Sequence, residues 1–361
     1  MSHAPSPAAP PSPVVGLIAN PVSARDIRRI VANAGNLQLP DRVNIVLRLL
    51  AALAATGVSR VLMMPDRAGL AAMLARHLER ERRQGHVLAQ VEMLDMVPVA
   101  TVEDSCRAAR LLREAGAAAI VVLGGDGTHR AVVRELVANT GDWRETVPVC
   151  GLSTGTNNAF PELRESTTAG LAVGLYATGR LPAEVALAAN KLLEVRIDGA
   201  AGTRSDIALV DAVLADERLI AARALWKPEG LRAVYLAFAE AQAIGLSSIG
   251  GLLQPVPRDA PGGLAVHLAP EPARRRQVVR APIAPGMVRA IGIEHVEAMP
   301  PGQDFAVRQA AGVVALDGER ELAFGAGERV HISVRANAFS TIDVGRCLHE
   351  AALRGLLCGA A

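Results

Sequence analysis

The strongest constraint on the fold is Ala118–Leu123, a run of six residues that are all apolar. A strand with one face in water alternates polar and apolar side chains, whereas an unbroken apolar run is typical of a parallel strand covered on both faces. The glycine-rich stretch Gly124–Thr128 follows at once, and His129–Val137 then has a helical pattern. A buried strand, a glycine loop and a helix in this order predict a layered α/β domain.

The rest of the first half repeats this alternation of strand and helix. Further strands are predicted at Val14–Ala19, Arg60–Met64, Val87–Met93 and Val147–Leu152, and helices after Asp41 as the cap, over Leu70–Leu78, and from Thr101-Val-Glu-Asp104 to Ala115. Strands that alternate with helices at this spacing predict a doubly wound parallel sheet.

The pattern changes after about Leu181. Short β-branched segments follow, at Leu192–Ile197, Ile207–Leu214, Leu264–Leu268, Val288–Ile293, Val313–Leu316 and Val330–Val334. Turn residues separate them, which predicts a β-rich, mostly antiparallel second domain, with Pro255–Pro261 as a surface connection. We therefore expect a disordered tail over residues 1–13, an α/β domain over 14–185, a β-rich domain over 186–340, and a C-terminal helix within 341–361 that packs back on the first domain.

Composition argues against several classes of protein. Aromatic residues are 2% of the chain, so the stacking platforms of RNA- and single-strand-binding modules are not expected. The formal charge of +2 indicates neither a nucleic-acid nor a membrane surface, and the basic runs Arg25–Arg29 and Arg274–Arg276 fit a solvated face or loop. The four cysteines lie far apart, and neither a signal peptide nor a membrane-spanning run is present. A cytoplasmic protein without a cysteine-based zinc site is expected.

Gly124–Thr128 is the sharpest candidate for a functional site. Glycines let the backbone turn tightly and let a phosphate approach the main-chain N–H groups, while the dipole of the following helix favours an anion. Asp126 would repel a phosphate, but its carboxylate suits holding Mg²⁺ or accepting a proton from an attacking hydroxyl. The alternative is an ordinary strand-to-helix turn in which Asp126 caps the helix. Residue spacing alone leaves both interpretations open.

A second polar loop, Ser153–Asn158, follows the predicted strand Val147–Leu152. Hydroxyl and amide side chains around Gly155 suit a polyphosphate or a ribose, although they also suit a helix N-cap with polar turn residues. In a parallel sheet this loop lies on the same edge as Gly124–Thr128, where ligands of open α/β sheets bind. Neither loop is a Walker A motif or a dinucleotide-binding fingerprint.

Together these motifs resemble the superfamily of NAD kinases, diacylglycerol kinases and sphingosine kinases. Gly124–Thr128 is similar to its nucleotide-phosphate loop, Asn20-Pro21 to its opening turn, Ser153–Asn158 to its second loop, and Leu316-Asp317-Gly318-Glu319 to its Asp-Gly-Glu segment. The resemblance implies an NAD kinase-like fold, ATP, Mg²⁺ and NAD as ligands, and Asp126 as the catalytic group. It also implies nucleotide or phosphate binding by Asn20, Gly124, Gly125, Gly127, Thr128, Thr154, Gly155, Thr156, Asn157 and Asn158, and an acceptor side at Asp211, Asp317 and Glu319.

Within this superfamily the chain resembles the acetoin catabolism protein X group. That resemblance rests on Asn20–Asn36, Leu39-Pro-Asp-Arg42, Val61–Asp66, Ser153–Asn158 and Ala222–Trp226. NAD kinases carry an Asn-Glu pair and a Gly-Ser-Thr-Ala-Tyr segment, to which the nearest matches are Val210-Asp211, without the amide, and Ser247–Gly251, without the tyrosine. The phosphate half of a kinase site is therefore intact, while the acceptor half is altered.

Three functions fit these motifs. The first is a kinase that moves a phosphoryl group from ATP or polyphosphate to NAD or a related small molecule, with NADP biosynthesis or acetoin catabolism implied by the resemblance. The second is a lipid-hydroxyl kinase of the diacylglycerol type, although the chain lacks a basic amphipathic helix for docking on a membrane. The third is a nucleotide-binding accessory protein without turnover. Resemblance to related kinases also implies a homo-oligomer.

Overall fold

The structure is a computed structural model that describes residues 13–20, 37–138, 140–153, 159–160, 164–216, 230–318 and 320–358. Its N-terminal half contains β1 (Val14–Ala19), α2 (Leu39–Ala55), β2 (Arg60–Met63), α3 (Leu70–Arg83), β3 (Gln90–Met93), α4 (Val102–Glu114), β4 (Ala119–Gly124), α5 (Asp126–Val137), η2 (Trp143–Glu145), β5 (Val149–Ser153) and α6 (Ser166–Ala177). Its C-terminal half contains α7 (Ala183–Ala186), β6 (Leu187–Gly199), β7 (Gly202–Ala208), β8 (Asp211–Ala215), β9 (Leu231–Leu236), α9 (Ser247–Leu253), β10 (Gly263–Leu268), η4 (Pro272–Arg274), β11 (Gln277–Ala284), β12 (Met287–Met299), β13 (Phe305–Ala306), β14 (Gly312–Leu316), β15 (Arg320–Phe324), β16 (Arg329–Ile342) and α10 (Val344–Leu353).

Two sheets organise these elements. Nine of the described strands form the first sheet, in the order β3-β2-β1-β4-β5-β16-β6-β7 with β13 paired to β16. Its first five strands are parallel to one another. Seven described strands form the second sheet, β11-β12-β10-β9-β8-β14-β15, which is antiparallel throughout. The predicted parallel sheet and β-rich antiparallel part are both confirmed.

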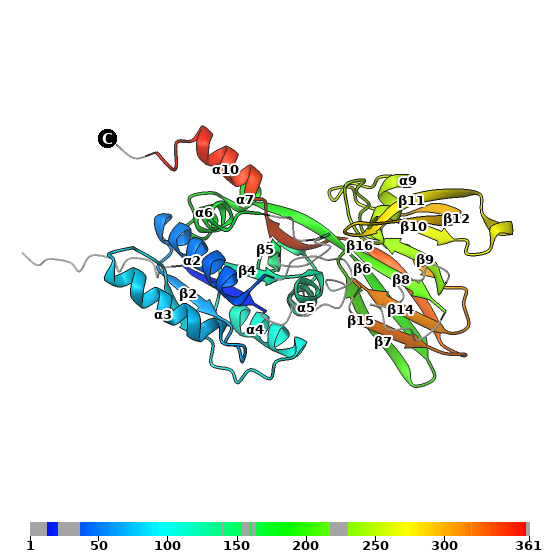
Figure 1. Ribbon diagram of the computed structural model, residues 1–361, viewed down its shortest axis with the longest axis horizontal. Coiled ribbons are helices and arrows are strands. Elements are labelled where there is room, and N and C mark those ends of the chain that lie inside the picture. The colour runs from blue at the N-terminus through cyan, green and yellow to red at the C-terminus, as the bar shows by residue number, and fades with distance from the viewer. Residues whose placement is uncertain are drawn as a thin grey trace, which may run out of the picture.

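Helices cover both faces of the parallel strands (Figure 1). Alternate residues of β1 divide between two cores, because successive side chains of a strand point to opposite faces. Leu17 packs in the core formed with α2, α3 and α6, whereas Ile18 packs in the core formed with α4 and α5. All six residues of β4 are buried, as the unbroken apolar run predicts.

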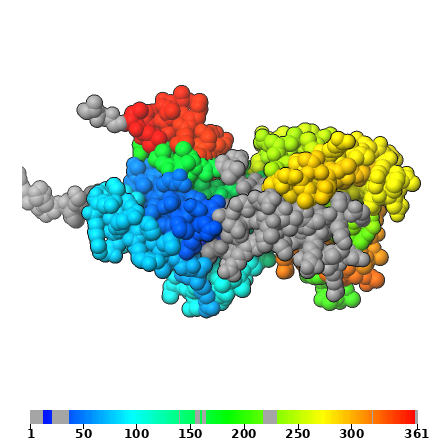
Figure 2. All heavy atoms as spheres, viewed as in Figure 1, coloured from blue at the N-terminus to red at the C-terminus, as the bar shows by residue number. Residues whose placement is uncertain are grey.

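The long strands β6 and β16 connect the helical half to the β-rich half, and Figure 1 shows both crossing between them. Their antiparallel pairing runs from Leu187 opposite Ile342 to Asp198 opposite Arg329. The first sheet therefore continues across residue 186, where the sequence predicts a domain boundary. At the helical end, α10 packs on α6 and α7, and in Figure 2 the red residues of α10 lie on the surface of that half.

Some predicted elements differ in their bounds. α2 begins at Leu39, with Pro40 in its first turn, where the missing N–H of proline costs no hydrogen bond. Asp41 accepts a hydrogen bond from the N–H of Gln38 at 3.0 Å, so it belongs to a capping box and is not the cap itself. Among the described residues, no helix combines the length and apolar character that a membrane crossing requires.

The predicted strand Ile207–Leu214 is two strands, β7 and β8. The chain leaves the ladder between them because the N–H groups of Leu209 and Val210 donate to the carboxylate of Asp317 instead of to a neighbouring strand. A side chain more than 100 residues away thus breaks a segment that looks continuous in the sequence.

Candidate functional site

The loop after β4 is as tight as its glycines predict. A Cβ atom at Gly124 would lie 2.6 Å from Cβ of Thr128, so only glycine fits there. Gly125 is the N-cap of α5, and its carbonyl accepts hydrogen bonds from the N–H groups of Thr128 and His129, both at 3.1 Å. The helix therefore begins at Asp126, three residues earlier than the sequence pattern indicates.

Asp126 is the first residue of α5 and is half-buried. Its carboxylate accepts hydrogen bonds from the backbone N–H groups of Phe160, at 3.0 Å, and Ala159, at 3.4 Å. The N-cap residue of α5 is Gly125, which has no side chain. The carboxylate of Asp126 does not cap the helix and instead contacts residues 159 and 160. The interpretation of Asp126 as an ordinary helix cap is therefore wrong, and the carboxylate is held by two amides at the edge of the sheet.

Arg258 holds the same segment from the other side. Its guanidinium donates to the carbonyl of Phe160, at 2.9 Å, and to the carbonyl of Ala159. The guanidinium is itself fixed by Glu240, at 2.9 Å, and lies 4.1 Å from the ring centroid of Phe238. Because the N–H groups of residues 159 and 160 hold Asp126 while their carbonyls hold Arg258, a residue of the β-rich half positions a carboxylate of the helical half.

Lys191 fixes the loop that carries Arg258. This lysine is 5% exposed, and its ammonium donates to the carbonyls of Pro257 (2.9 Å), Ala260 (2.5 Å) and Gly262 (2.6 Å). Burial lowers its pKa to about 8. The stretch Pro255–Pro261, predicted as a simple surface connection, is thus anchored to β6 and points Arg258 at the candidate site.

Asn20, at the end of β1, joins the loop to a neighbouring cavity. Its backbone N–H donates to the carbonyl of Leu123 at 3.1 Å, and its side-chain amide donates to the hydroxyl of Thr128 at 3.2 Å. Arg42 of α2, which is 1% exposed, donates to the Asn20 carbonyl at 2.8 Å. The end of the first strand and the glycine loop are therefore joined by hydrogen bonds.

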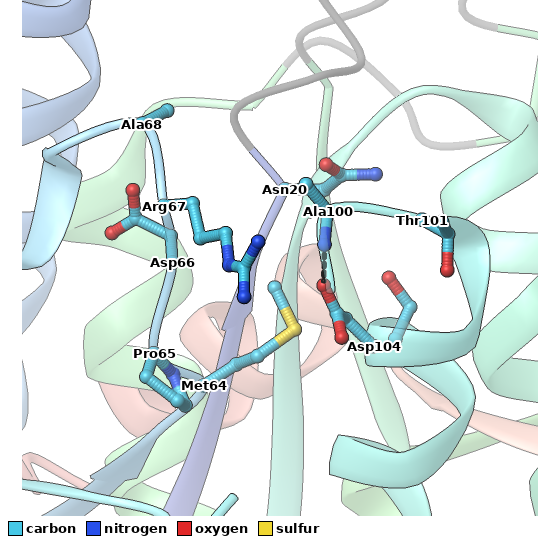
Figure 3. Close-up of a pocket in the computed structure, with 10 residues that line it drawn as sticks. Asn20, Met64, Pro65, Asp66, Arg67, Ala68, Ala100, Thr101 and Asp104 are labelled. Atoms are coloured by element: carbon cyan, nitrogen blue, oxygen red, sulfur yellow. Dashed lines mark hydrogen bonds between the residues drawn. The ribbon is translucent and has the colours of Figure 1, made fainter. Parts of the chain in front are cut away.

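A cavity of about 240 Å³ opens beside Asn20, between the loop after β2 and the start of α4 (Figure 3). Arg67 points its guanidinium into this space between Met64 and Asn20, and its side chain makes no hydrogen bond or ion pair with any described residue. Across the cavity, Asp104 is 7% exposed and accepts hydrogen bonds from the N–H groups of Val99 (2.9 Å) and Ala100 (2.7 Å). One cation without an ionic partner in the described part of the chain thus faces a cavity at the carboxyl edge of the sheet.

The predicted acceptor side contains a buried carboxylate. The side chain of Asp317 is 0% exposed and accepts backbone hydrogen bonds from Leu209 (3.0 Å), Val210 (2.8 Å) and Asp211 (3.3 Å). Burial raises its pKa to about 7 and outweighs these hydrogen bonds and the charge of Arg130; the charge of Asp126 raises the pKa further. The two carboxylates, distant in the sequence, are close enough to interact.

Arg130 of α5 links this turn to β7. It lies 3.2 Å from Asp206 and 3.9 Å from Asp317, and the side chains of all three are at most 6% exposed. Arg134 and Arg320 add ion pairs to Asp206 at 3.6 Å and 3.4 Å. Since a buried charge is stable only when it is paired, these residues lock the β-rich domain to α5.

The fold thus brings together Asn20, Gly124, Gly125, Asp126, Gly127, Thr128, Asp211 and Asp317. Ser153 pairs with Gly124 in the sheet, so the second loop begins beside the first. Thr154, Gly155, Thr156, Asn157, Asn158 and Glu319 lie outside the described residues, as do Pro21 and residues 1–12 of the tail predicted over 1–13. Sequence reasoning missed Arg67, Arg130, Lys191 and Arg258; the one available signal was that Lys191 is one of two lysines in a chain whose basic residues are otherwise arginine.

Comparison with known proteins adds a family. Residues 15–180 match the model of the ATP-NAD kinase N-terminal domain, and residues 191–337 match that of the acetoin catabolism protein X C-terminal domain. The chain is 56% identical to acetoin catabolism protein X of Cupriavidus necator over 99% of its own length and 97% of that protein. This chain belongs to the acetoin catabolism protein X family. The resemblance found in the sequence is confirmed.

A solved structure shares this fold. The crystal structure of yeast NADH kinase complexed with NADH is similar with a TM-score of 0.51 and 11% identity, covering 98% of this chain and 90% of the yeast chain. A diacylglycerol kinase from Bacillus anthracis has a TM-score of 0.38 and 11% identity, covering 92% of this chain and 96% of that chain. At 11% identity the likeness to the yeast kinase shows a common fold, and the predicted NAD kinase-like architecture is confirmed.

Proposed function

We propose that the chain is a phosphotransferase that moves a phosphoryl group from ATP, or another polyphosphate, to a hydroxyl of NAD or a related small molecule. The observation that carries the proposal is Asp126, held by two backbone amides at the carboxyl end of β4 and at the N-terminus of α5. Nucleotide phosphates are favoured at such a helix start by its free N–H groups and its dipole.

Asp126 would act on the acceptor, not on the phosphates. A half-buried carboxylate with part of its hydrogen-bonding capacity unused suits orienting a hydroxyl and accepting its proton as the phosphoryl group arrives. Phosphoryl transfer depends mainly on position and charge stabilisation, so the rigid support from Arg258 matters as much as the carboxylate itself.

Mg²⁺ fits this arrangement as an ion carried by the nucleotide. Within the described ranges, no group of three or more His, Cys, Asp or Glu side chains could hold a metal ion. Mg²⁺ in phosphoryl-transfer sites takes one or two carboxylates, with phosphate oxygens and water as its other ligands. With Asp126 assigned to the acceptor, phosphate oxygens and water would hold most of the ion's coordination sites, and the ion would neutralise charge on the phosphates.

Arg67 supports the assignment of the cavity beside Asn20 to the nucleotide. A guanidinium without an ionic partner suits a phosphate oxygen, which it binds through paired N–H donors. We expect Arg67→Gln to raise KM for the nucleotide about tenfold, or about 1.4 kcal/mol, with kcat little changed. Arg76→Gln, an exposed arginine of the adjacent α3, is the matched control. Equal KM values for the two variants would show that Arg67 does not bind the nucleotide.

The deciding experiment is phosphoryl transfer from γ-labelled ATP with Mg²⁺ to a panel of NAD, NADH, acetoin and diacylglycerol vesicles. Label on NAD or a related small molecule supports the proposal. Label on the lipid alone would select a diacylglycerol-type kinase instead. No label on any acceptor would contradict the proposed activity.

The altered acceptor half favours one second candidate, a nucleotide-binding protein without turnover. Ser247 and Ser248, which stand near the position of the Gly-Ser-Thr-Ala-Tyr segment, are buried in α9, and the Ser248 hydroxyl donates to the carbonyl of Gly245 at 2.6 Å. The Ser248 hydroxyl therefore serves the fold, whereas the Ser247 hydroxyl is buried without a hydrogen-bond partner among the described residues. Calorimetry that gives tight ATP binding, together with an unlabelled acceptor panel, would select this candidate.

A further inference from the structure

A second cavity, of about 490 Å³, lies in the β-rich half, and the proposed phosphotransfer does not use it. Its walls come from β9, β10 and β12 and from residues 306–309, which follow the short strand β13. Small-molecule sites are typically 300–1,000 Å³, so the space suits a metabolite.

The cavity lies at the end of β10 away from the loop that carries Arg258. The loop that carries Arg258 enters β10 at Gly263, whereas the cavity is lined by His267, Leu268 and Pro270 at the other end of the strand. At about 3.3 Å per residue, the five residues from Leu264 to Leu268 separate the two ends by more than 10 Å. A ligand in this cavity would therefore leave the glycine loop unobstructed.

One wall of the cavity is made of rings with hydrogen-bonding atoms. His267 and His295 are directly opposite each other on β10 and β12, and their rings stack at 6.0 Å. Tyr235 meets His267 edge-on at 6.2 Å. Tyr235 is only 2% exposed, yet its hydroxyl has no hydrogen-bond partner among the described residues. Burial, reinforced by Glu297, raises the pKa of Tyr235 to about 12, so the hydroxyl keeps its proton and is a donor without an acceptor.

Most charged groups that line the cavity have a partner. Glu297 bonds His267 at 2.9 Å, Glu294 bonds Arg274 at 2.5 Å, and Arg232 pairs with Asp216, with only a weaker charge interaction between Arg232 and Glu271. Two lining guanidiniums, those of Arg276 and Arg308, form no ion pair or hydrogen bond within the part of the chain that the structure describes. The charge of Arg308 also acts on Tyr235, so this cation lies near the unused hydroxyl.

We propose that this cavity binds a small organic dianion, a dicarboxylate or a phosphate ester, through Arg276, Arg308 and the Tyr235 hydroxyl. Two guanidiniums supply paired donors for two acidic groups, and the hydroxyl supplies a neutral donor between rings that cover the ligand's apolar part. The site is separate from the proposed phosphotransfer, so the result of testing one does not depend on the other.

Calorimetric titration of the full chain with succinate and, separately, with glycerol 3-phosphate tests the site and distinguishes carboxylate from phosphate. We expect one of the two to bind with Kd below about 1 mM. The double variant Arg276→Gln/Arg308→Gln should weaken that binding at least tenfold, and Tyr235→Phe should weaken it severalfold. Arg289→Gln, an exposed arginine elsewhere on β12, is the matched control and should bind as the wild type does.

The substituted arginines are exposed, so each arginine variant should unfold on heating at the same temperature as the wild type. Arg67→Gln serves as a second control, because it separates binding here from binding at the glycine loop. The proposal is overturned if neither probe binds below about 1 mM, or if the double variant binds as tightly as the wild type.

Discussion

Two Asp-Gly pairs, in the loop after β4 and in the turn between β14 and β15, have opposite environments. Asp126 begins a helix, is half-buried and is held by two amides on one side. Asp317 has a positive φ of 49°, as Gly318 has at 70°, in a hairpin turn of the kind that favours Asp-Gly. Its side chain is fully buried and accepts three backbone N–H groups.

The comparison separates a carboxylate that can reach a ligand from one that holds the fold. Both residues were candidates because they occur in similar motifs, and nothing in either dipeptide distinguishes them. Asp317 accepts three hydrogen bonds from the backbone between β7 and β8 and is fully buried, whereas Asp126 is half-buried and accepts two hydrogen bonds from described residues. Accordingly, substitution of Asp126 should affect activity and substitution of Asp317 should affect stability.

Asp126→Asn gives the largest expected effect on rate. If Asp126 accepts the proton of the acceptor hydroxyl, the amide should lower kcat by about 10²–10⁴-fold, while the free energy of unfolding changes little. Steady-state kinetics and urea unfolding measure the two quantities. Asp95→Asn, at an exposed position between β3 and α4, is the control. An Asp126→Asn protein as fast as the wild type would show that Asp126 does not accept the proton.

Asp317→Ala should produce the converse result. Removal of the carboxylate leaves Arg130 buried without one partner and three N–H groups without an acceptor, so we expect a loss of about 3–5 kcal/mol in the free energy of unfolding. Asp304→Ala, which breaks an exposed pair with Arg196, should cost about 1 kcal/mol or less. If both variants unfold at the same urea concentration, Asp317 does not hold the fold.

Arg258→Gln sharpens the boundary between these roles, because Arg258 is buried less deeply but supports Asp126 through residues 159 and 160. We expect kcat to fall about 10–100-fold with KM for the nucleotide unchanged, since a displaced carboxylate affects the transfer step and not nucleotide binding. Arg258→Lys should recover little, because lysine cannot make the paired contacts. Arg196→Gln, an arginine with an exposed ion pair, is the control. An unchanged kcat in Arg258→Gln would show that the clamp is dispensable.

The last prediction concerns how the free energy of unfolding changes with pH, and the change per pH unit is small. The folded-state pKa of Asp317, about 7, is above its ordinary value of 3.8, so the folded protein keeps a proton that the unfolded chain releases. The resulting contribution is full below pH 3.8 and is lost as pH rises to 7, with a slope of at most about 1.4 kcal/mol per unit. Urea unfolding from pH 4 to 7 should show a shallower decline for Asp317→Asn than for the wild type. Parallel curves would mean that Asp317 is ionised in the folded state.

The secondary structure of the helical half was largely predictable. The bounds of β1, the start of α3 and the burial of β4 follow from apolar periodicity, which reports on neighbours within one or two turns. The split of Ile207–Leu214 into β7 and β8 was not predictable, because Asp317 causes it from 108 residues away. The roles of Arg258 and Arg130 were invisible for the same reason: an arginine in a sequence shows its charge but not its partner.

The α/β class, the alternation of strands and helices in the first half, the glycine loop and the family can be read from the amino-acid sequence alone, because each lies in local periodicity or in a contiguous motif. The packed structure was needed to show that residues 159 and 160 hold Asp126 and that Asp317 bonds the backbone between β7 and β8. It alone gathered Tyr235, Arg276 and Arg308 around one cavity. Hydrogen bonds and charge interactions act over a few ångströms in space, and the distances that they require are set only when the two sheets pack together.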